Sequence, residues 1–151
     1  MVKHLKENRG QAIVEFALVL PFLLTLLLGI IEFGWLFNSW LTITSSAREG
    51  ARVAAVNIDV SNDSVQMAVK RHVEGLSGFV FDDVNYTSKN SLDAATLSVG
   101  HAAVAIEPWD INNRSPGSEV AVYVKGSVKP LVGVFVQHPV EIWGQAVMRR
   151  E

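Results

Sequence analysis

The hydrophobic positions of the chain are concentrated in one segment near its N-terminus. Residues 16–31 contain no charged side chain, and the apolar character continues as far as Leu41. About 20 helical residues, each rising about 1.5 Å, cross the hydrocarbon core of a bilayer. Three aromatic residues stand at the far end of the segment, where an aromatic belt at the membrane surface is expected: Trp35, Phe37 and Trp40. The pattern therefore predicts a transmembrane helix over residues 11–41.

The helical pattern continues beyond the predicted membrane segment, through residues 42–57. Small residues recur there at spacings of three and four, at Ala47, Gly50, Ala51, Ala54 and Ala55. A face of small side chains lets backbones approach closely. We expect this extension to be helical and to lie outside the membrane.

Three charged residues also lie on this extension. Arg48 and Arg52 are four residues apart and share one side of the helix, and Glu49 is placed to form an ion pair with Arg52. One hypothesis is a solvated, salt-bridged face, because exposed ion pairs contribute little stability. The other hypothesis is a contact with the helix of a neighbouring chain.

Residues 58–151 show the patterns of a small domain that begins with a helix. Five residues fall on one helical face and predict a helix over residues 61–76: Val65, Val69, His72, Val73 and Leu76. Ser61 can cap the start of this helix, and Gly78 can end it. His72 is predicted to be a core residue rather than a metal ligand.

The remaining hydrophobic positions alternate with polar ones, as they do in strands. The clearest strand is residues 120–128, where valines alternate with a series that includes Tyr123 and Lys125, so that one face is buried and the other is wet. Residues 97–106, 140–148 and 80–87 predict two further strands and a short edge strand; the inner side of 140–148 carries Val140, Ile142, Ala146 and Met148. The predicted fold class is α+β: a long N-terminal transmembrane helix, a second helix, and a small antiparallel sheet of three to four strands.

Two connections in this domain differ in character. Residues 107–118 are rich in Pro, Asn and Gly, which predicts an exposed loop that either binds a partner or simply joins two strands. Residues 129–139 are apolar enough to pack against the domain or to touch a partner, with Leu131, Val132, Val134 and Phe135.

The distribution of charge gives the membrane segment a direction. Lys3, Lys6 and Arg9 precede the apolar run, and few cations directly follow it, so we expect the N-terminus in the cytoplasm and the rest exported. The formal net charge is −2 and no basic face is apparent, which argues against a nucleic-acid partner. The chain has no cysteine, so disulfides, thiolate zinc sites and cysteine nucleophiles are excluded.

Motifs for catalysis or for cofactor binding are missing from the sequence. The four histidines, His4, His72, His101 and His138, have no metal-ligand spacing. There is no nucleophile elbow and no phosphate-binding glycine loop. We expect no catalytic residue, no metal, no cofactor and no small-molecule substrate.

The cytoplasmic edge of the predicted membrane segment carries a distinct motif. Residues 9–16 read Arg-Gly-Gln-Ala-Ile-Val-Glu-Phe, which places Glu15 inside the apolar run and five positions after Gly10. A carboxylate costs about 2.5–3.5 kcal/mol at mid-bilayer and less near an edge, so Glu15 requires a reason. Cleavage after Gly10 would create an α-amino group on Gln11, with which Glu15 of a neighbouring chain can pair. That pair would fix the register of helices whose other contacts are unspecific.

This motif resembles the processing site of prepilins, in particular the short-leader prepilins of Flp/Tad (tight adherence) pili, in which the glutamate is followed by an aromatic residue, here Phe16. The resemblance implies that an inner-membrane prepilin peptidase removes residues 1–10 as a cytoplasmic leader. Glu32-Phe33-Gly34 and residues 47–55 are similar to the TadE-like signature, and residues 145–151 are similar to the usual end of TadE-like chains. The resemblance is firm over residues 9–56 and implies an accessory pseudopilin.

The leading hypothesis is a non-enzymatic minor pilin or pseudopilin of the bacterial inner membrane, required for Flp/Tad pilus assembly, adherence and biofilm formation. Its domain, residues 58–151, would be periplasmic, and its implied partners are the prepilin peptidase, other Tad pilins and the assembly platform. The alternative is an unprocessed, membrane-anchored periplasmic binding module. A cleaved secretory signal fits less well, because its apolar core is only about 7–15 residues long. An anchored enzyme would require an active site that the sequence does not reveal.

Two residues of the membrane segment have open roles. Glu32 lies about one membrane thickness beyond Gln11, either at interfacial depth beside Trp35 or in contact with a partner's helix. Pro21 can kink the helix, because proline removes a backbone hydrogen bond.

Overall fold

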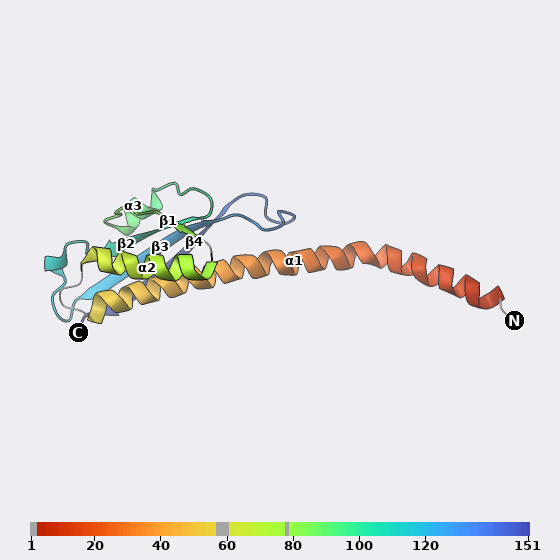
Figure 1. The fold of residues 1–151 in the computed structure, drawn as a ribbon, viewed down its shortest axis with the longest axis horizontal. Helices are drawn as coiled ribbons and strands as arrows, with labels where there is room; N and C mark the ends of the chain where they lie inside the picture. The colour runs from red at the N-terminus through yellow and green to blue at the C-terminus, as the bar shows by residue number, and fades with distance from the viewer. Residues whose placement is uncertain (1–2, 57–60, 78) are drawn as a thin grey trace.

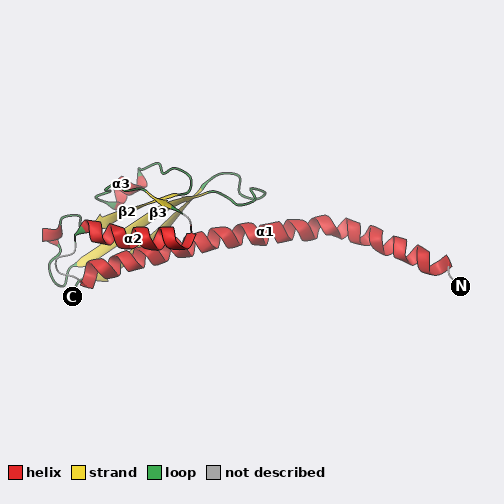
Figure 2. Cartoon of the chain, viewed as in Figure 1, coloured by secondary structure: helices red, strands yellow, loops and turns green. Residues whose placement is uncertain are grey.

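A single long helix organises the molecule. The computed structural model describes the backbone of residues 3–56, 61–77 and 79–151, and the side chains of all of these except residues 3–9, 76 and 77. Helix α1 (Lys3–Val56) is 54 residues long, and the rest of the chain packs against its C-terminal half (Figure 1). It curves along its length but continues without a break through Pro21 (Figure 2). The other elements are α2 (Asn62–Ser77), β1 (Val80–Phe81), α3 (Lys89–Asp93), β2 (His101–Glu107), the 3-10 helix η1 (Ile111–Asn113), β3 (Glu119–Val128) and β4 (Val140–Arg149).

The sheet has four strands in the order β1-β2-β3-β4. β2, β3 and β4 are antiparallel, as predicted, but β1 is parallel to β2, so the prediction of a purely antiparallel sheet is wrong at this edge. The physical reason is the connection: residues 82–100 form a crossover that contains α3, and a crossover can bring the chain back in the same direction. The predicted strand 80–87 is reduced to two residues, and the predicted strand 97–106 begins only at His101, after the turn at Gly100 with φ of 82°.

Helices α1 and α2 cover one face of the sheet and form the main core with it. Val65, Val69 and Val73 of α2 are fully buried, as the helical pattern predicts. Ser61 accepts a hydrogen bond from the backbone N–H of Ser64 (3.3 Å) and so caps α2, whereas the predicted end at Gly78 lies outside the described residues. His72 is half-buried, and its Nε2 lies 3.0 Å from Ser45 Oγ of α1.

The other face of the sheet is covered over β2 and part of β3, which corrects the expectation that it is wet there, whereas the same face of β4 is largely exposed. Helix α3 and the loop after it place Leu92 and Leu97 over Ala103 and Ala105 of β2 in a second, smaller core. Lys125, expected on the wet side of β3, is only 1% exposed. A helix of five residues is too short to show an amphipathic repeat, so this cover could not be predicted from the hydrophobic pattern.

Close backbone contact between α1 and the sheet depends on small residues. A Cβ atom at Gly144 of β4 would lie 2.6 Å from the backbone oxygen of Ile43, and one at Gly50 of α1 would lie 2.6 Å from Val69. Ala47, Ala51 and the other small residues of this face are buried within the same chain. The small-residue face that the sequence predicts on α1 is therefore the face that packs against α2 and the sheet.

Candidate functional site

The N-terminal half of α1 is an exposed apolar rod. Every side chain from residue 10 to residue 27 is exposed, and Phe22 is 78% exposed. Within the described part of the chain, one helix, Gly10–Val56, is long and apolar enough to cross a membrane; its most apolar stretch has a mean hydropathy of 2.5 and is 6% buried. A core helix of similar composition would be covered, and an apolar surface of this size is not stable in water. The helix therefore indicates a single-pass membrane anchor.

The residues of the predicted processing site lie at the start of this rod. Gly10 and Gln11 are helical and exposed, and no atom lies within 4 Å of the position that a Cβ would take at Gly10. Gln11 Nε2 donates a hydrogen bond to Glu15 Oε1 at 3.0 Å, which places the two residues on one side of the helix. Phe16, the aromatic residue of the motif, is 58% exposed. These residues have no contact with the domain that would interfere with access to them.

Glu32 has a partner that neither sequence hypothesis named. Its side chain is fully buried, and its carboxylate accepts two hydrogen bonds from the backbone of the loop between β3 and β4. The N–H of Gly133 donates to Oε1 at 3.0 Å, and the N–H of Phe135 donates to Oε2 at 3.1 Å. Both oxygens are thus occupied within the same chain, about a hundred residues away in sequence.

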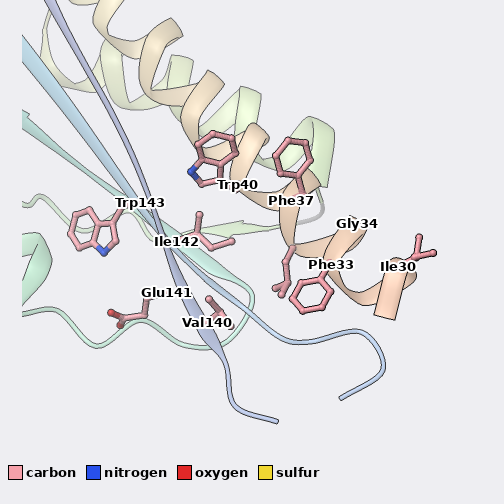
Figure 3. A pocket seen from close by; sticks show the side chains of 10 residues that line it. Ile30, Phe33, Gly34, Phe37, Trp40, Val140, Glu141, Ile142 and Trp143 are labelled. Carbon is pink, nitrogen blue, oxygen red and sulfur yellow. The ribbon is translucent and has the colours of Figure 1, made fainter. Parts of the chain in front are cut away.

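Two apolar grooves flank the contact between this loop and α1. The larger is about 950 Å³ and lies between α1 and β4, where Phe37, Trp40 and Ile142 line it (Figure 3). The smaller is about 700 Å³ and runs from Phe22 along α1 to Phe135 of the loop. Both grooves are open and continuous with the exposed rod, so apolar material can lie along α1 on either side of the loop.

The charged residues of the helical extension form a solvated face. Arg52 donates to both carboxylate oxygens of Glu49, at 2.7 and 3.0 Å, which confirms the predicted pair. These hydrogen bonds hold the pKa of Glu49 below its ordinary value. Arg48 is exposed beside them. The hypothesis of a contact with a neighbouring chain stays a prediction for all three residues.

The loop at residues 107–118 is tied to the domain at its centre. Arg114 is 3% exposed; its Nε donates to the backbone oxygen of Pro108 at 2.8 Å, and its guanidinium also contacts Asn62 Oδ1 of α2. Burial, together with the nearby charge of Arg150, lowers the pKa of Arg114. The expectation that the loop is exposed is therefore right for much of it but wrong at Arg114.

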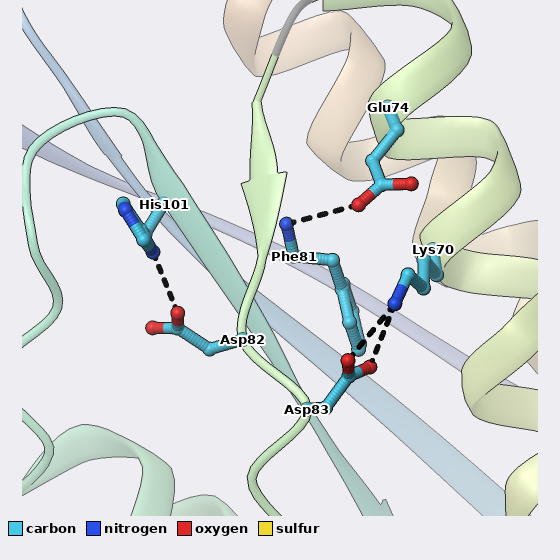
Figure 4. A network of polar contacts seen from close by, with 6 residues as sticks. All are labelled: Lys70, Glu74, Phe81, Asp82, Asp83 and His101. Atoms are coloured by element: carbon cyan, nitrogen blue, oxygen red, sulfur yellow. Dashed lines mark hydrogen bonds and ion pairs between the residues drawn. The ribbon is translucent and has the colours of Figure 1, made fainter.

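A further polar network, which the sequence pattern did not predict, holds the parallel edge strand β1 in place (Figure 4). Lys70 of α2 forms an ion pair with Asp83 at 2.9 Å, and Asp82 lies 2.6 Å from His101 Nδ1. Glu74 accepts from the backbone N–H of Phe81 at 3.3 Å. Among the residues that the structure describes, no group of three or more His, Asp or Glu side chains is arranged to hold a metal ion.

An α+β domain built on the C-terminal half of a long, apolar N-terminal helix is the architecture of a pilin-like, membrane-anchored protein. Residues 10–52 match the family model described as TadE-like protein, so the predicted TadE-like resemblance is confirmed over this part of the chain. The match begins at Gly10 and extends along α1 as far as Arg52. No curated protein matches the chain, and no solved structure matches it.

Proposed function

We propose that this chain is a structural, non-enzymatic minor pilin or pseudopilin, processed by a prepilin peptidase between Gly10 and Gln11 and required for assembly of the Flp/Tad pilus, for adherence and for biofilm formation. One observation carries the proposal: the exposed apolar rod of α1 starts at Gly10 and contains Glu15 as its one charged residue before Glu32. Such a rod is stable either in a bilayer or among the helices of a fibre. A pilin passes from the first environment to the second.

The role of Glu15 follows from its distance from the new N-terminus. Gln11 and Glu15 lie within hydrogen-bonding reach on one side of the helix, so processing would place a positive α-amino group close to a carboxylate. In apolar surroundings these charges attract strongly, because the local dielectric constant is low. Pairing between the amine of one chain and the carboxylate of the next would fix how far one helix slides along its neighbour.

The proposed topology divides the chain into four parts. Residues 1–10 form the cytoplasmic leader, with Lys3, Lys6 and Arg9 as the cations that keep it inside. Residues 11–41 cross the inner membrane, 42–57 extend the helix, and 58–151 form the periplasmic domain. The peptidase acts first, and the assembly platform then moves the processed chain into contact with other Tad pilins. The TadE-like match and the position of the domain at the far end of α1 support this division of the chain.

The variant Glu15→Gln tests the function directly in cells that make the pilus. The amide keeps the size and hydrogen bonding of the side chain but removes its charge, so we expect normal processing and membrane insertion but no assembled pili by electron microscopy. Glu119→Gln is the control, because it removes an exposed carboxylate from β3 of the domain, outside the apolar rod, and it should leave pili intact. Normal pili in Glu15→Gln cells would contradict the proposed role.

A further inference from the structure

The loop between β3 and β4, residues 129–139, runs back along α1 toward its N-terminus (Figure 1). The Phe135 ring lies 3.1 Å from the position that a Cβ would take at Gly29, and its centroid is 6.2 Å from that of Phe33. The indole N–H of Trp35 donates to the backbone oxygen of Lys129 at 3.2 Å and holds the base of the loop on the same helix. The loop is therefore attached to α1 over the stretch from Gly29 to Trp35.

This attachment fixes the depth of the loop relative to a membrane. Gly29 lies about 27 Å along α1 from Gln11, the start of the proposed span, at about 1.5 Å per helical residue, and so near the far side of a hydrocarbon core about 30 Å thick. A ring in contact with Gly29 lies at the same depth. The groove beside Phe135 continues to Phe22, about 10 Å further in than Gly29 by the same rise. Side chains of the loop and of the membrane helix thus share one apolar surface.

The composition of the loop fits such a position. Four apolar side chains at its tip are between 39% and 57% exposed: Leu131, Val132, Val134 and Phe135. Exposed polar residues, Lys129 at one end and His138 at the other, flank this tip. An apolar tip between polar flanks is the pattern of a segment that lies at the boundary between lipid headgroups and acyl chains.

Glu32 supplies two of the hydrogen-bond acceptors that a loop at this depth requires. Irregular backbone in contact with lipid has no water to bond with, so its N–H groups need partners from the protein. The Glu32 carboxylate accepts from the N–H groups of Gly133 and Phe135, in the middle of the apolar tip. The turn that presents both groups has Gly133 at φ of 74°, a conformation that favours glycine. The same two hydrogen bonds occupy both carboxylate oxygens of Glu32 at the end of the apolar run.

We propose that the tip of this loop, residues 131–135, lies in the outer leaflet of the membrane that α1 crosses. The hydrogen bonds of Glu32 hold the tip against α1 at this depth. The proposal rests on the proposed membrane anchorage of α1. The occupant of the surface around the tip is lipid acyl chain, because the tip and the rod form one uninterrupted apolar surface. The domain would then rest on the membrane at two places, the helix and the loop, and would be fixed in its orientation.

The absence of cysteine from the chain allows a clean test by single-site labelling. The full chain carrying Leu131→Cys, labelled with a small fluorophore, is reconstituted one copy per lipid nanodisc with and without nitroxide-labelled phosphatidylcholine. We expect the nitroxide to reduce its emission roughly twofold or more, as for a group at the acyl boundary. Phe22→Cys is the control for a position inside the span, and Met67→Cys, on the exposed side of α2, is the control for a position in water.

The controls separate failure of the loop proposal from failure of the anchor. Quenching at residue 22 without quenching at residue 131 would overturn the loop proposal and leave the anchor standing. No quenching at residue 22 would overturn both. Adding Glu32→Gln to the Leu131→Cys chain should lower the quenching at residue 131, whereas adding Glu49→Gln should not. Equal quenching in the Glu32→Gln chain, with its fold intact by circular dichroism, would overturn the role of Glu32.

Discussion

At the scale of single residues, two buried charges hold distant segments of the chain in place. Glu32 accepts hydrogen bonds from backbone N–H groups of the β3–β4 loop, and Lys125 donates to the backbone oxygens of Asp93 and Ala95, at 3.2 and 2.8 Å. Lys125 also pairs with Glu141 at 3.0 Å and lies over the Trp143 ring. Such charges are retained in a core when every partner is supplied by the protein.

The variant Lys125→Met tests this function of a buried charge. Methionine keeps most of the apolar stem but leaves two backbone oxygens beside α3 without their donor, so we expect a loss of about 1–3 kcal/mol in the free energy of unfolding. Denaturant unfolding of the full chain in detergent measures it, and hydrogen exchange should show loosening centred on residues 88–97. Lys129→Met, an exposed control, should change stability by less than about 0.5 kcal/mol. Equal stability of the two variants would contradict the assignment.

The same residues show what the sequence could and could not reveal about the site. The sequence predicts roles for Gly10, Gln11 and Glu15 because the motif is local and because a carboxylate in an apolar run stands out; these roles stay predictions. The partner of Glu32 could not be found, because Gly133 is about a hundred positions away and donates through its backbone. The sequence shows two features of this contact separately: Glu32 has no predicted partner nearby in the sequence, and the loop at residues 129–139 is apolar. Nothing in the sequence indicates that the two are in contact.

At the scale of elements, the packing of α1 on the sheet depends on a backbone-to-backbone contact at Gly144. We expect Gly144→Ala to destabilise the domain by about 1–3 kcal/mol or more, because the added methyl group meets the Ile43 backbone at 2.6 Å and rigid backbone cannot move aside. Gly75→Ala is the matched control, since nothing lies within 4 Å of that position on α2. Thermal unfolding of both variants measures the difference. Equal midpoints would show that α1 does not press on β4 at this point.

Long elements were predicted correctly from the sequence, and short elements were not. Helix α2 and strands β3 and β4 each span enough residues for a hydrophobic period to repeat, and the structure confirms them. Strand β1 has two residues and helix α3 has five, so neither could show a period. These short elements decide the direction of the edge strand and the cover of the second face. The predicted direction was wrong, and the predicted wet face was wrong over β2 and part of β3.

At the scale of the whole molecule, α1 belongs to two environments. Its C-terminal half carries Ile43 and Ala47 into the core of the domain, while its N-terminal half is exposed from Gly10 onward. The domain can therefore keep its fold while the exposed half exchanges lipid for other helices. In the proposed function this exchange begins only after the leader has been removed, because only then does Gln11 carry the amine that pairs with Glu15.

The most direct measurement is the N-terminal residue of the protein purified from cells that make the pilus, determined by Edman degradation or by mass spectrometry of the intact chain. The account predicts that the chain begins at Gln11. It also predicts that Gly10→Leu leaves the chain beginning at Met1 and prevents pilus formation, whereas Gly75→Leu is processed normally. A native chain that begins at Met1 in assembled pili would contradict the account and would favour an unprocessed membrane-anchored binding module.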